Sequence, residues 1–243
     1  VPVIGCDCEV CMSKDVRDNR TRSSVHIQFA GLSLQIDTGP DFRTQMLREG
    51  LTHVDAVLFT HEHQDHVAGL DDVRPIIFRV RKEMALYGQQ RVLDRIKKAF
   101  DYAFKAQPYP GAPSFTTTSI EAELAFTING VEVLPLGINH GNLPILGYRI
   151  GDTAYLTDVN DIPDEAMEQL SGLNYLILDA LHRKEHYSHF NLTQAIEWAT
   201  KIGARHTYFI HMSHYMGKHE DVEKELPEGM QLSFDGLRIP VTI

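Results

Sequence analysis

Long apolar runs are missing from this sequence. None approaches the roughly 18 consecutive apolar residues that a membrane-spanning helix needs. The first residues, Val1-Pro2-Val3-Ile4-Gly5, also lack the basic and apolar regions of a secretory signal. Low-complexity composition is absent as well, since 43% of the 243 residues are hydrophobic and can form a sizeable core. We therefore expect a soluble, cytoplasmic protein with no membrane partner.

Positive charge is also scarce. There are 23 Lys and Arg residues against 33 Asp and Glu, so the formal net charge is −10. Such a charge disfavours a general nucleic-acid binder, which gains affinity from a positive field. Eight of the basic residues fall between Arg79 and Lys105, and a local basic patch there could hold a phosphate backbone. The solvated face of an amphipathic helix explains them more simply, so nucleic acid is the less expected partner.

Cysteine is limited to Cys6, Cys8 and Cys11. An odd number within six residues is a poor disulfide framework, and it fits a reducing compartment. Thiolates this close are better suited to sharing a metal ion. The 13 histidines, many of them in short clusters, are a second indication of metal.

The hydrophobic pattern predicts a mixed α/β protein in which strands dominate. Strands are expected at 24–29, 32–36, 55–60, 125–128, 131–136, 145–150, 154–157, 175–178 and 207–210, with a turn at Ala30-Gly31. Helices are expected at 41–48, 89–105, 163–170 and 192–201. The segments 74–88 and 107–119 are interpreted as loops that would carry substrate specificity. A single domain over 1–243 is expected, with two sheet-forming halves near 24–136 and 137–240.

The most informative segment is His61-Glu62-His63-Gln64-Asp65-His66, which follows a short apolar run. In extended chain, side chains two residues apart point the same way, so His61 and His63 can bind one ion. As the chain turns, Asp65 and His66 can face a second ion. Three histidines and an aspartate in six residues indicate a metal site rather than a solvated loop.

This segment, extended from Phe59 to Leu70, resembles the signature of the metallo-β-lactamase superfamily. Later elements of the family pattern follow in order at His140-Gly141, Thr157-Asp158 and His211, and Asp37-Thr38-Gly39 resembles the early Asp-x-Gly. The resemblance implies an αββα sandwich of two β-sheets with outer helices. It also implies one catalytic ion bound by His61, His63 and His140, a second bound by Asp65, His66 and His211, and a bridging Asp158. Asp37 is expected to orient the histidine loop rather than to bind metal.

The cysteines indicate a further site. Three thiolates can occupy three corners of a zinc tetrahedron, and His214, three residues beyond His211, can supply the fourth. We therefore expect a structural zinc bound by Cys6, Cys8, Cys11 and His214, with the loop 5–12 as the zinc-binding loop. This combination resembles the phosphoribosyl 1,2-cyclic phosphate phosphodiesterase branch of the superfamily, from the carbon–phosphorus lyase pathway. Within Ser188-His189-Phe190, His189 resembles the further catalytic histidine of that branch.

The resemblance implies a phosphodiesterase that attacks a small, cyclic phosphodiester with hydroxide activated by two metal ions. Asp65 and His189 would be the catalytic residues, with His189 as acid or charge stabiliser. The branch favours manganese in the catalytic pair, although zinc suits the same ligands. An RNA 3′-end processing nuclease and a lactone or thioester hydrolase stay open as alternatives, as does a metal-dependent protein without activity. A homodimer is expected only from the frequency of dimers among soluble enzymes.

Overall fold

The computed structural model describes residues 1–29 and 31–241. Contacts divide the chain into two compact units, which we describe separately: one comprises residues 22–121, and the other residues 1–21 together with 122–243. Among the described residues, no helix has both the length and the apolar character required to cross a membrane. The turn predicted at Ala30-Gly31 includes Ala30, which lies outside the described residues.

The 22–121 unit contains a five-stranded sheet in the order β1-β2-β3-β4-β5. Only β1 and β2 are antiparallel, and the remaining neighbours are parallel. Their bounds are β1 Val25–Phe29, β2 Leu32–Ile36, β3 Ala56–Leu58, β4 Met84–Gly88 and β5 Phe115–Ser119. All three residues of β3 are buried, as expected of a central strand in a parallel sheet.

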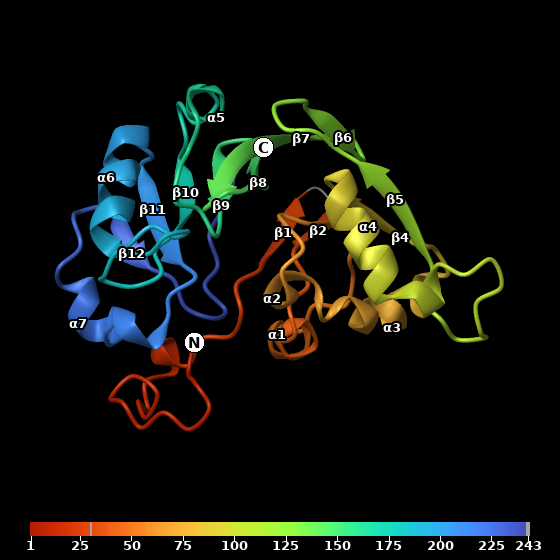
Figure 1. Cartoon of the computed structure of the whole chain (residues 1–243), viewed down its shortest axis with the longest axis horizontal. Coiled ribbons are helices and arrows are strands. Elements are labelled where there is room, and N and C mark those ends of the chain that lie inside the picture. The colour runs from red at the N-terminus through yellow and green to blue at the C-terminus, as the bar shows by residue number, and fades with distance from the viewer. Residues whose placement is uncertain (30, 242–243) are drawn as a thin grey trace. The chain divides into compact units, whose positions relative to one another are not determined.

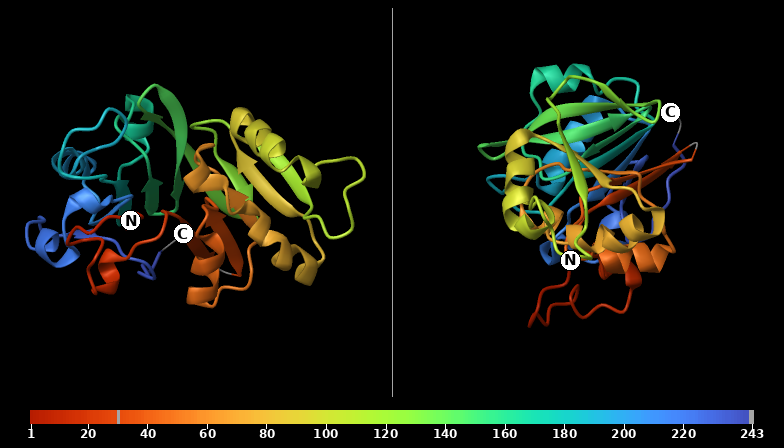
Figure 2. Two further views of the ribbon diagram at one scale, coloured as in Figure 1. Left: turned by 60° about the horizontal axis from the view of Figure 1, so that its bottom comes forward. Right: turned by 90° about the vertical axis from the view of Figure 1, so that its right-hand side faces the viewer.

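Four helices accompany this sheet: α1 Phe42–Glu49, α2 Gln64–Val67, α3 Arg74–Val80 and α4 Gln90–Ala99. Figures 1 and 2 show α4 lying along β4, and it buries Val92, Leu93 and Ile96 on that side. The predicted helix 89–105 is therefore too long. The chain leaves the helical conformation at Phe100, and Phe104 instead stacks on Phe115 of β5 with ring centroids 5.4 Å apart.

Two predicted loops contain regular structure. The segment 74–88 contains α3 and β4, and the end of the segment 107–119 is β5. Strand β4 was missed because its alternating pattern is short, with Met84, Leu86 and Gly88 buried. Strand β5 was missed because it is an edge strand rich in threonine, with no residue fully buried. Residues that determine substrate specificity are therefore not restricted to irregular loops in these segments, because parts of both segments are helix or strand.

The second unit contains a seven-stranded sheet in the order β12-β11-β10-β9-β8-β7-β6. Strands β6 to β9 pair antiparallel, whereas β9 to β12 pair parallel. The strands are β6 Phe126–Ile128, β7 Val131–His140, β8 Leu143–Ile150, β9 Thr153–Leu156, β10 Tyr175–Asp179, β11 His206–Ile210 and β12 Met230–Leu232. The helices are α5 Asp164–Glu168, α6 Leu192–Ile202 and α7 His219–Glu223. The α6 helix packs against β10 and buries Ala195 and Ala199 (Figure 1).

The boundary between the units lies at Glu121–Ala122, earlier than the predicted boundary of the two halves near residue 136. The reason is the β6–β7 hairpin, whose two-residue turn is Asn129-Gly130. Both turn residues have positive φ, 48° and 83°, as a tight hairpin of this twist requires. Because β7 then continues to His140 and pairs with β8, the whole hairpin belongs to the second sheet. The prediction of a mixed α/β fold with two sheets and helices is confirmed.

Three of the predicted site residues share an uncommon backbone conformation. Asp37 follows β2, Asp158 lies two residues after β9, and His211 follows β11, with φ angles of 60°, 55° and 60°. Non-glycine residues in this left-handed region are strained and cluster at functional sites. The chain thus turns sharply at the end of a buried strand and presents a polar side chain there, in each unit.

Candidate metal centre

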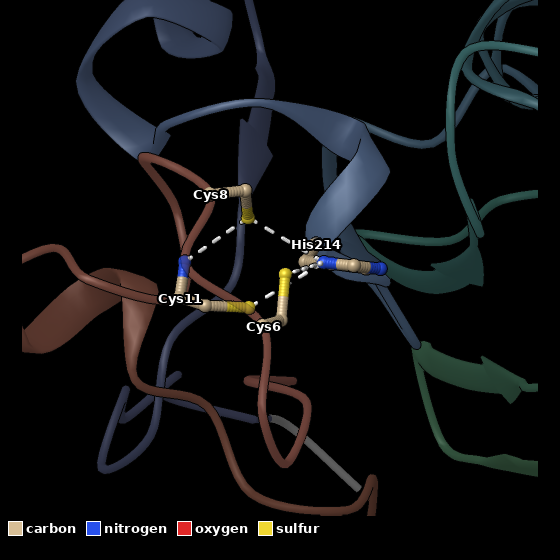
Figure 3. Close-up of side chains that lie close together, drawn as sticks. All are labelled: Cys6, Cys8, Cys11 and His214. Carbon is tan, nitrogen blue, oxygen red and sulfur yellow. Dashed lines mark hydrogen bonds between the residues drawn. The ribbon is translucent and has the colours of Figure 1, made fainter.

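The three cysteines converge on His214 within the second unit (Figure 3). The Nδ1 atom of His214 lies 3.3 Å from Cys6 Sγ, 3.5 Å from Cys8 Sγ and 3.4 Å from Cys11 Sγ. Two donors bound to one tetrahedral zinc, at the usual Zn–S and Zn–N lengths, would be about 3.5 Å apart. The four donor atoms also lie within 4.8 Å of one another, so these side chains could hold one metal ion.

The loop geometry favours thiolate at Cys8, whereas the pKa of Cys6 is raised, because its hydrogen bond with the Cys8 backbone is outweighed by its side-chain hydrogen bonds with Cys8 and Cys11 and by its desolvation. The backbone N–H of Cys11 donates to Cys8 Sγ at 3.4 Å, and this bond lowers the pKa of the Cys8 thiol to about 6. Thiolate is the form that binds zinc. The loop is fixed at its start by Val1 N, which donates to Met212 O at 2.7 Å. Met212 lies between His211 and His214, so this one segment carries a residue of the thiol cluster and a residue of the cluster described below.

In the 22–121 unit, the histidine loop is organised by the fully buried carboxylate of Asp37. Its Oδ2 accepts from His66 Nδ1 at 2.7 Å and from Thr60 Oγ1 at 2.8 Å, and its Oδ1 accepts from Thr60 N at 2.9 Å. Thr60 Oγ1 also lies 3.0 Å from His61 Nδ1. One carboxylate thus orients His66 directly and His61 through a hydroxyl group.

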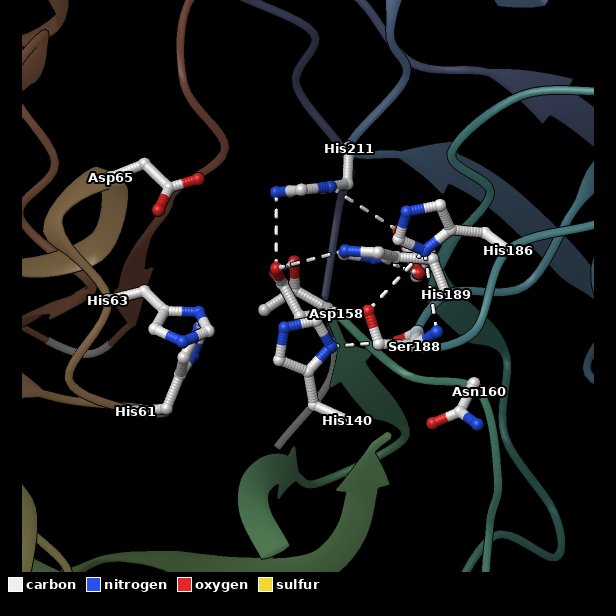
Figure 4. A network of polar contacts seen from close by, with 12 residues as sticks. His61, His63, Asp65, His140, Asp158, Asn160, His186, Ser188, His189 and His211 are labelled. Carbon is white, nitrogen blue, oxygen red and sulfur yellow. Dashed lines mark hydrogen bonds and ion pairs between the residues drawn. The ribbon is translucent and has the colours of Figure 1, made fainter. Parts of the chain in front are cut away.

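This orientation is the one that metal-binding histidines adopt. When Nδ1 donates to a protein oxygen, Nε2 is the nitrogen available to an ion. His61 Nε2 lies 3.0 Å from His63 Nδ1, close to the separation of about 3.3 Å between two nitrogens bound to one zinc-sized ion. His66 Nε2 lies 3.7 Å from Asp65 Oδ2. His61 and His63 therefore form one neighbouring pair, and Asp65 and His66 form another. Figure 4 shows His61, His63 and Asp65.

Two arginines form ion pairs with carboxylates of the histidine loop. Arg22 Nη1 lies 3.9 Å from Asp65 Oδ2, and Glu62 forms an ion pair with Arg91 of α4. The Arg91 side chain also donates to Gln89 Oε1 at 2.9 Å. Glu62 was given no role from the sequence, and its contact with Arg91 ties the histidine loop to the start of α4.

The second unit brings together its own predicted residues at the ends of β7, β9 and β11 (Figure 4). His140 Nδ1 donates to Ser188 O at 2.8 Å, which again presents Nε2 to an ion. His211 Nε2 lies 3.3 Å from Asp158 Oδ1. Asp158 is buried and also accepts a hydrogen bond from Thr157 Oγ1 at 2.6 Å. A buried carboxylate between imidazoles is costly to leave without a cation.

His189 joins this cluster from the segment that precedes α6. Its backbone is fixed by its neighbours: Phe190 N donates to Val159 O at 2.8 Å, and Asn191 begins α6 with a capping box that involves Gln194. The His189 ring stacks on His211, with centroids 5.0 Å apart and an interplanar angle of 12°. His189 Nε2 lies 4.0 Å from Asp158 Oδ1, so this nitrogen faces the predicted bridging carboxylate.

Asp179 has no role assigned from the sequence beyond its site-like position after a strand, although it contacts two predicted site residues. Its Oδ2 accepts from His189 Nδ1 at 2.9 Å, and its Oδ1 lies 3.6 Å from His211 Nδ1. Burial raises the pKa of Asp179 well above its ordinary range. The sequence did contain a signal, because Asp179 ends the buried strand β10 and thus occupies the kind of position that Asp37 and Asp158 occupy after β2 and β9.

His186 and Asn160 were also missed. His186 lies beside His189, with ring centroids 5.1 Å apart, and it carried no pattern that distinguished it from a surface histidine. Asn160 Oδ1 accepts from Gly141 N at 2.6 Å, which fixes the turn after His140. The sequence indicates only a structural or solvated role for His182, His186, His206 and His219. His219 is indeed buried against Arg20, whose Nη2 lies 2.8 Å from its Nδ1.

Comparison with known proteins agrees with these features. Residues 34–212 match the model of the beta-lactamase superfamily domain. The chain is 44% identical over 98% of its length to an octanoyltransferase of Porphyromonas gingivalis, and it spans about half (48%) of that longer protein. A stretch of 54 residues, 21% of this chain and 19% of the relative, is 43% identical to ribonuclease Z of Methanopyrus kandleri.

Among solved structures, the crystal structure of a new diphosphatase from the PhnP family matches with a TM-score of 0.93 and 42% identity. The match covers 100% of this chain and 93% of that chain. This likeness extends over the whole fold, including both sheets and the cysteine loop. The chain therefore has the metallo-β-lactamase fold and belongs to the metallo-β-lactamase superfamily of hydrolases, within its PhnP branch.

Proposed function

We propose that the chain is a phosphodiesterase whose two histidine clusters together bind two divalent ions. One ion is assigned to His61, His63 and His140, the other to Asp65, His66 and His211, and Asp158 bridges them. Manganese is proposed for this pair and zinc for the thiol cluster. The order of the motifs along the chain and membership of the superfamily support the assignment. When bound, such ions withdraw charge from a phosphoryl oxygen and acidify a water molecule.

The observation that carries the proposal is the buried network around Asp37. The Asp37 carboxylate accepts from His66 and orients His61 through Thr60. A loop of solvated histidines would not need such a buried partner. The network is the arrangement by which proteins fix the tautomer and direction of metal-binding imidazoles. His140 obeys the same rule, because its Nδ1 is engaged by Ser188 O.

His189 is proposed as the general acid. Its Nδ1 is held by Asp179, so that Nε2 is the nitrogen able to give a proton to the leaving oxygen. In the reaction, water loses one proton to solvent, the resulting hydroxide oxygen forms a bond to phosphorus, and the bond from phosphorus to the leaving oxygen breaks. The leaving oxygen keeps the electron pair and takes the proton of His189 Nε2, which solvent then restores. By accepting from Nδ1, Asp179 positions the ring.

A small phosphodiester is the proposed substrate class. The 42%-identical PhnP-family structure is described as a diphosphatase. A diphosphate esterified at both ends presents, at each phosphorus, the same disubstituted, singly charged centre as a phosphodiester. Both substrates therefore need the same chemistry: one P–O bond breaks, and one oxygen leaves with a proton.

The test compares substrates at equal concentration with the manganese-loaded chain. We expect turnover of bis(p-nitrophenyl) phosphate that falls at least about 10²-fold in Asp65→Ala, because a metal ligand is lost. We expect p-nitrophenyl phosphate, a monoester with a second negative charge, to react more slowly. The panel also contains a thioester and a lactone. If either of these were hydrolysed and neither phosphate were hydrolysed, the proposal would be wrong.

One observation favours an RNA 3′-end nuclease as a second candidate, namely the short match to ribonuclease Z. The basic residues near α3 and α4 are weak support for RNA binding, because some of them already pair with carboxylates. Arg91 is paired with Glu62, and Arg74 lies 3.7 Å from Asp71. A nuclease would bind RNA with a steep dependence on salt concentration, whereas a hydrolase of small phosphodiesters would not. A homodimer and a cytoplasmic location stay predictions.

The octanoyltransferase relative is twice the length of the matched region. We propose that acyl transfer belongs to the part of that protein outside the match, because the three cysteines of this chain all lie in the thiol cluster. This chain would then show no octanoyl transfer. Measurable transfer by this chain alone would contradict the division.

A further inference from the structure

An exposed aromatic pair lies beside the second histidine cluster and has no role in the proposed chemistry. The side chain of Tyr187 is 83% exposed, although its ring is packed on His186, with centroids 4.7 Å apart and an interplanar angle of 33°. His186 in turn contacts His189, with centroids 5.1 Å apart (Figure 4). The rings of His189, His186 and Tyr187 therefore form a continuous series of tilted contacts that ends at the exposed ring of Tyr187.

The position of Tyr187 is fixed by its surroundings rather than by burial of the ring. Its carbonyl oxygen accepts from Asn160 Nδ2 at 3.3 Å, and the same Asn160 side chain fixes Gly141 N. A Cβ atom at Gly141 would lie 3.2 Å from Ser188 Cβ and 3.7 Å from the Tyr187 ring. Glycine at 141, with φ of 62°, thus lets the ring lie against the turn that follows His140.

We propose that Tyr187 and His186 form a stacking subsite for a nucleobase carried by the substrate. The inference rests on the proposed function, because that function places the leaving oxygen at His189. Because His186 lies beside His189 and Tyr187 lies beside His186, a substrate group attached to this oxygen would be next to these two rings. Every nucleobase has a flat π face, and stacking on an aromatic side chain contributes about 1–3 kcal/mol per base. The subsite therefore takes a nucleotide-type phosphodiester, in which the base adds affinity without taking part in bond cleavage.

The experiment measures dissociation constants of two probes for the manganese-loaded chain by calorimetry. Adenosine 5′-monophosphate and ribose 5-phosphate share a phosphorylated sugar and differ in the adenine base. We expect the wild type to bind the nucleotide about 5- to 150-fold more tightly, as the stacking energy implies. Tyr187→Ala should reduce this ratio to near one, whereas Tyr187→Phe should keep it because the ring remains.

Tyr109→Ala serves as the control, because Tyr109 is also an exposed tyrosine but lies in the 22–121 unit. Its ratio should equal that of the wild type. Equal affinities of the wild type for both probes, or an unchanged ratio in Tyr187→Ala, would overturn the subsite. Since binding is measured without turnover, a chain that lacks phosphodiesterase activity but keeps the ratio would disprove the proposed function and leave the subsite standing.

Discussion

His66 donates from Nδ1 to the Asp37 carboxylate across 2.7 Å, and both side chains are almost completely buried. Asp37 also has a positive φ of 60°, which asparagine adopts as readily as aspartate. Asp37→Asn therefore keeps the turn while it removes the charge that orients the histidine loop. Among residues that are not proposed ligands, Asp37 is therefore the most informative one to substitute in a test of metal binding.

We expect Asp37→Asn to lower metal affinity or turnover by about 10- to 100-fold, as the loss of such a partner does elsewhere. Metal binding is measured by equilibrium dialysis, and the unfolding midpoint serves as a check on folding. Asp94→Ala, an exposed aspartate on α4 of the same unit, should behave as the wild type. Unchanged metal affinity and turnover in Asp37→Asn would show that the network is structural only.

The role of His189 is tested by comparing rate with metal content. His189→Ala should reduce turnover about 10²-fold or more, because general acid catalysis is lost, with metal content unchanged. His206→Ala, at the other end of β11 from His211, is the control. If His189→Ala lost metal along with activity, His189 would be a ligand, since Nε2 lies near Asp158. An unchanged rate would remove any catalytic role.

The thiol cluster predicts a zinc ion that survives mild chelation. Cys8→Ser should contain about one zinc ion fewer per chain than the wild type and should melt at a lower temperature, because the loop is no longer closed on His214. Zinc is counted by plasma mass spectrometry after dialysis against a weak chelator. Met12→Ser changes an exposed residue of the same loop and should keep its zinc. Equal zinc in all three proteins would refute the site.

His26 predicts a pH dependence of stability. Burial lowers the pKa of His26, whose ring nitrogens lie 3.1 Å from Gln35 Oε1 and 3.0 Å from Ser33 Oγ. Because the folded pKa is below the unfolded value of about 6.5, the stabilisation is complete above that value. It is lost as the pH falls below it, by at most about 1.4 kcal/mol per pH unit.

The measurement is urea denaturation of the wild type and of His26→Gln at pH 7.5 and at pH 5.5, chosen as about one unit on either side of that value. The free energy of unfolding should fall less on acidification in the variant than in the wild type. Because both proteins contain all the other histidines, the difference between them reports the contribution of His26 alone. An identical fall in both proteins would mean that His26 does not titrate with folding.

Much of the fold could be predicted because buried strands leave a strong pattern. The runs around β3, β9 and β10 are continuous and apolar, and each ends at a polar residue. The edge strand β5 could not be predicted, since its threonines face solvent and resemble a loop. Likewise, α4 ends at Ala99 and Phe104 packs on Phe115, a tertiary contact that no local pattern reveals.

The site was predicted where ligands cluster in sequence or follow a known order, as for His61-x-His63 and the cysteine loop. Partners that act through a single hydrogen bond were harder to find. Asp179 reaches His189 from a strand ten residues away, and Thr60 connects Asp37 to His61 through its hydroxyl group. Such contacts depend on how strands are placed side by side, which one sequence does not specify.

The central claim is that the two histidine clusters share one pair of ions. Electron paramagnetic resonance of the manganese-loaded chain tests it directly, because two Mn²⁺ ions about 3.5–4 Å apart with a common ligand are magnetically coupled. We predict a spectrum of exchange-coupled manganese in the wild type and its loss in Asp158→Ala. A spectrum of isolated Mn²⁺ ions in the fully loaded wild type would contradict the account.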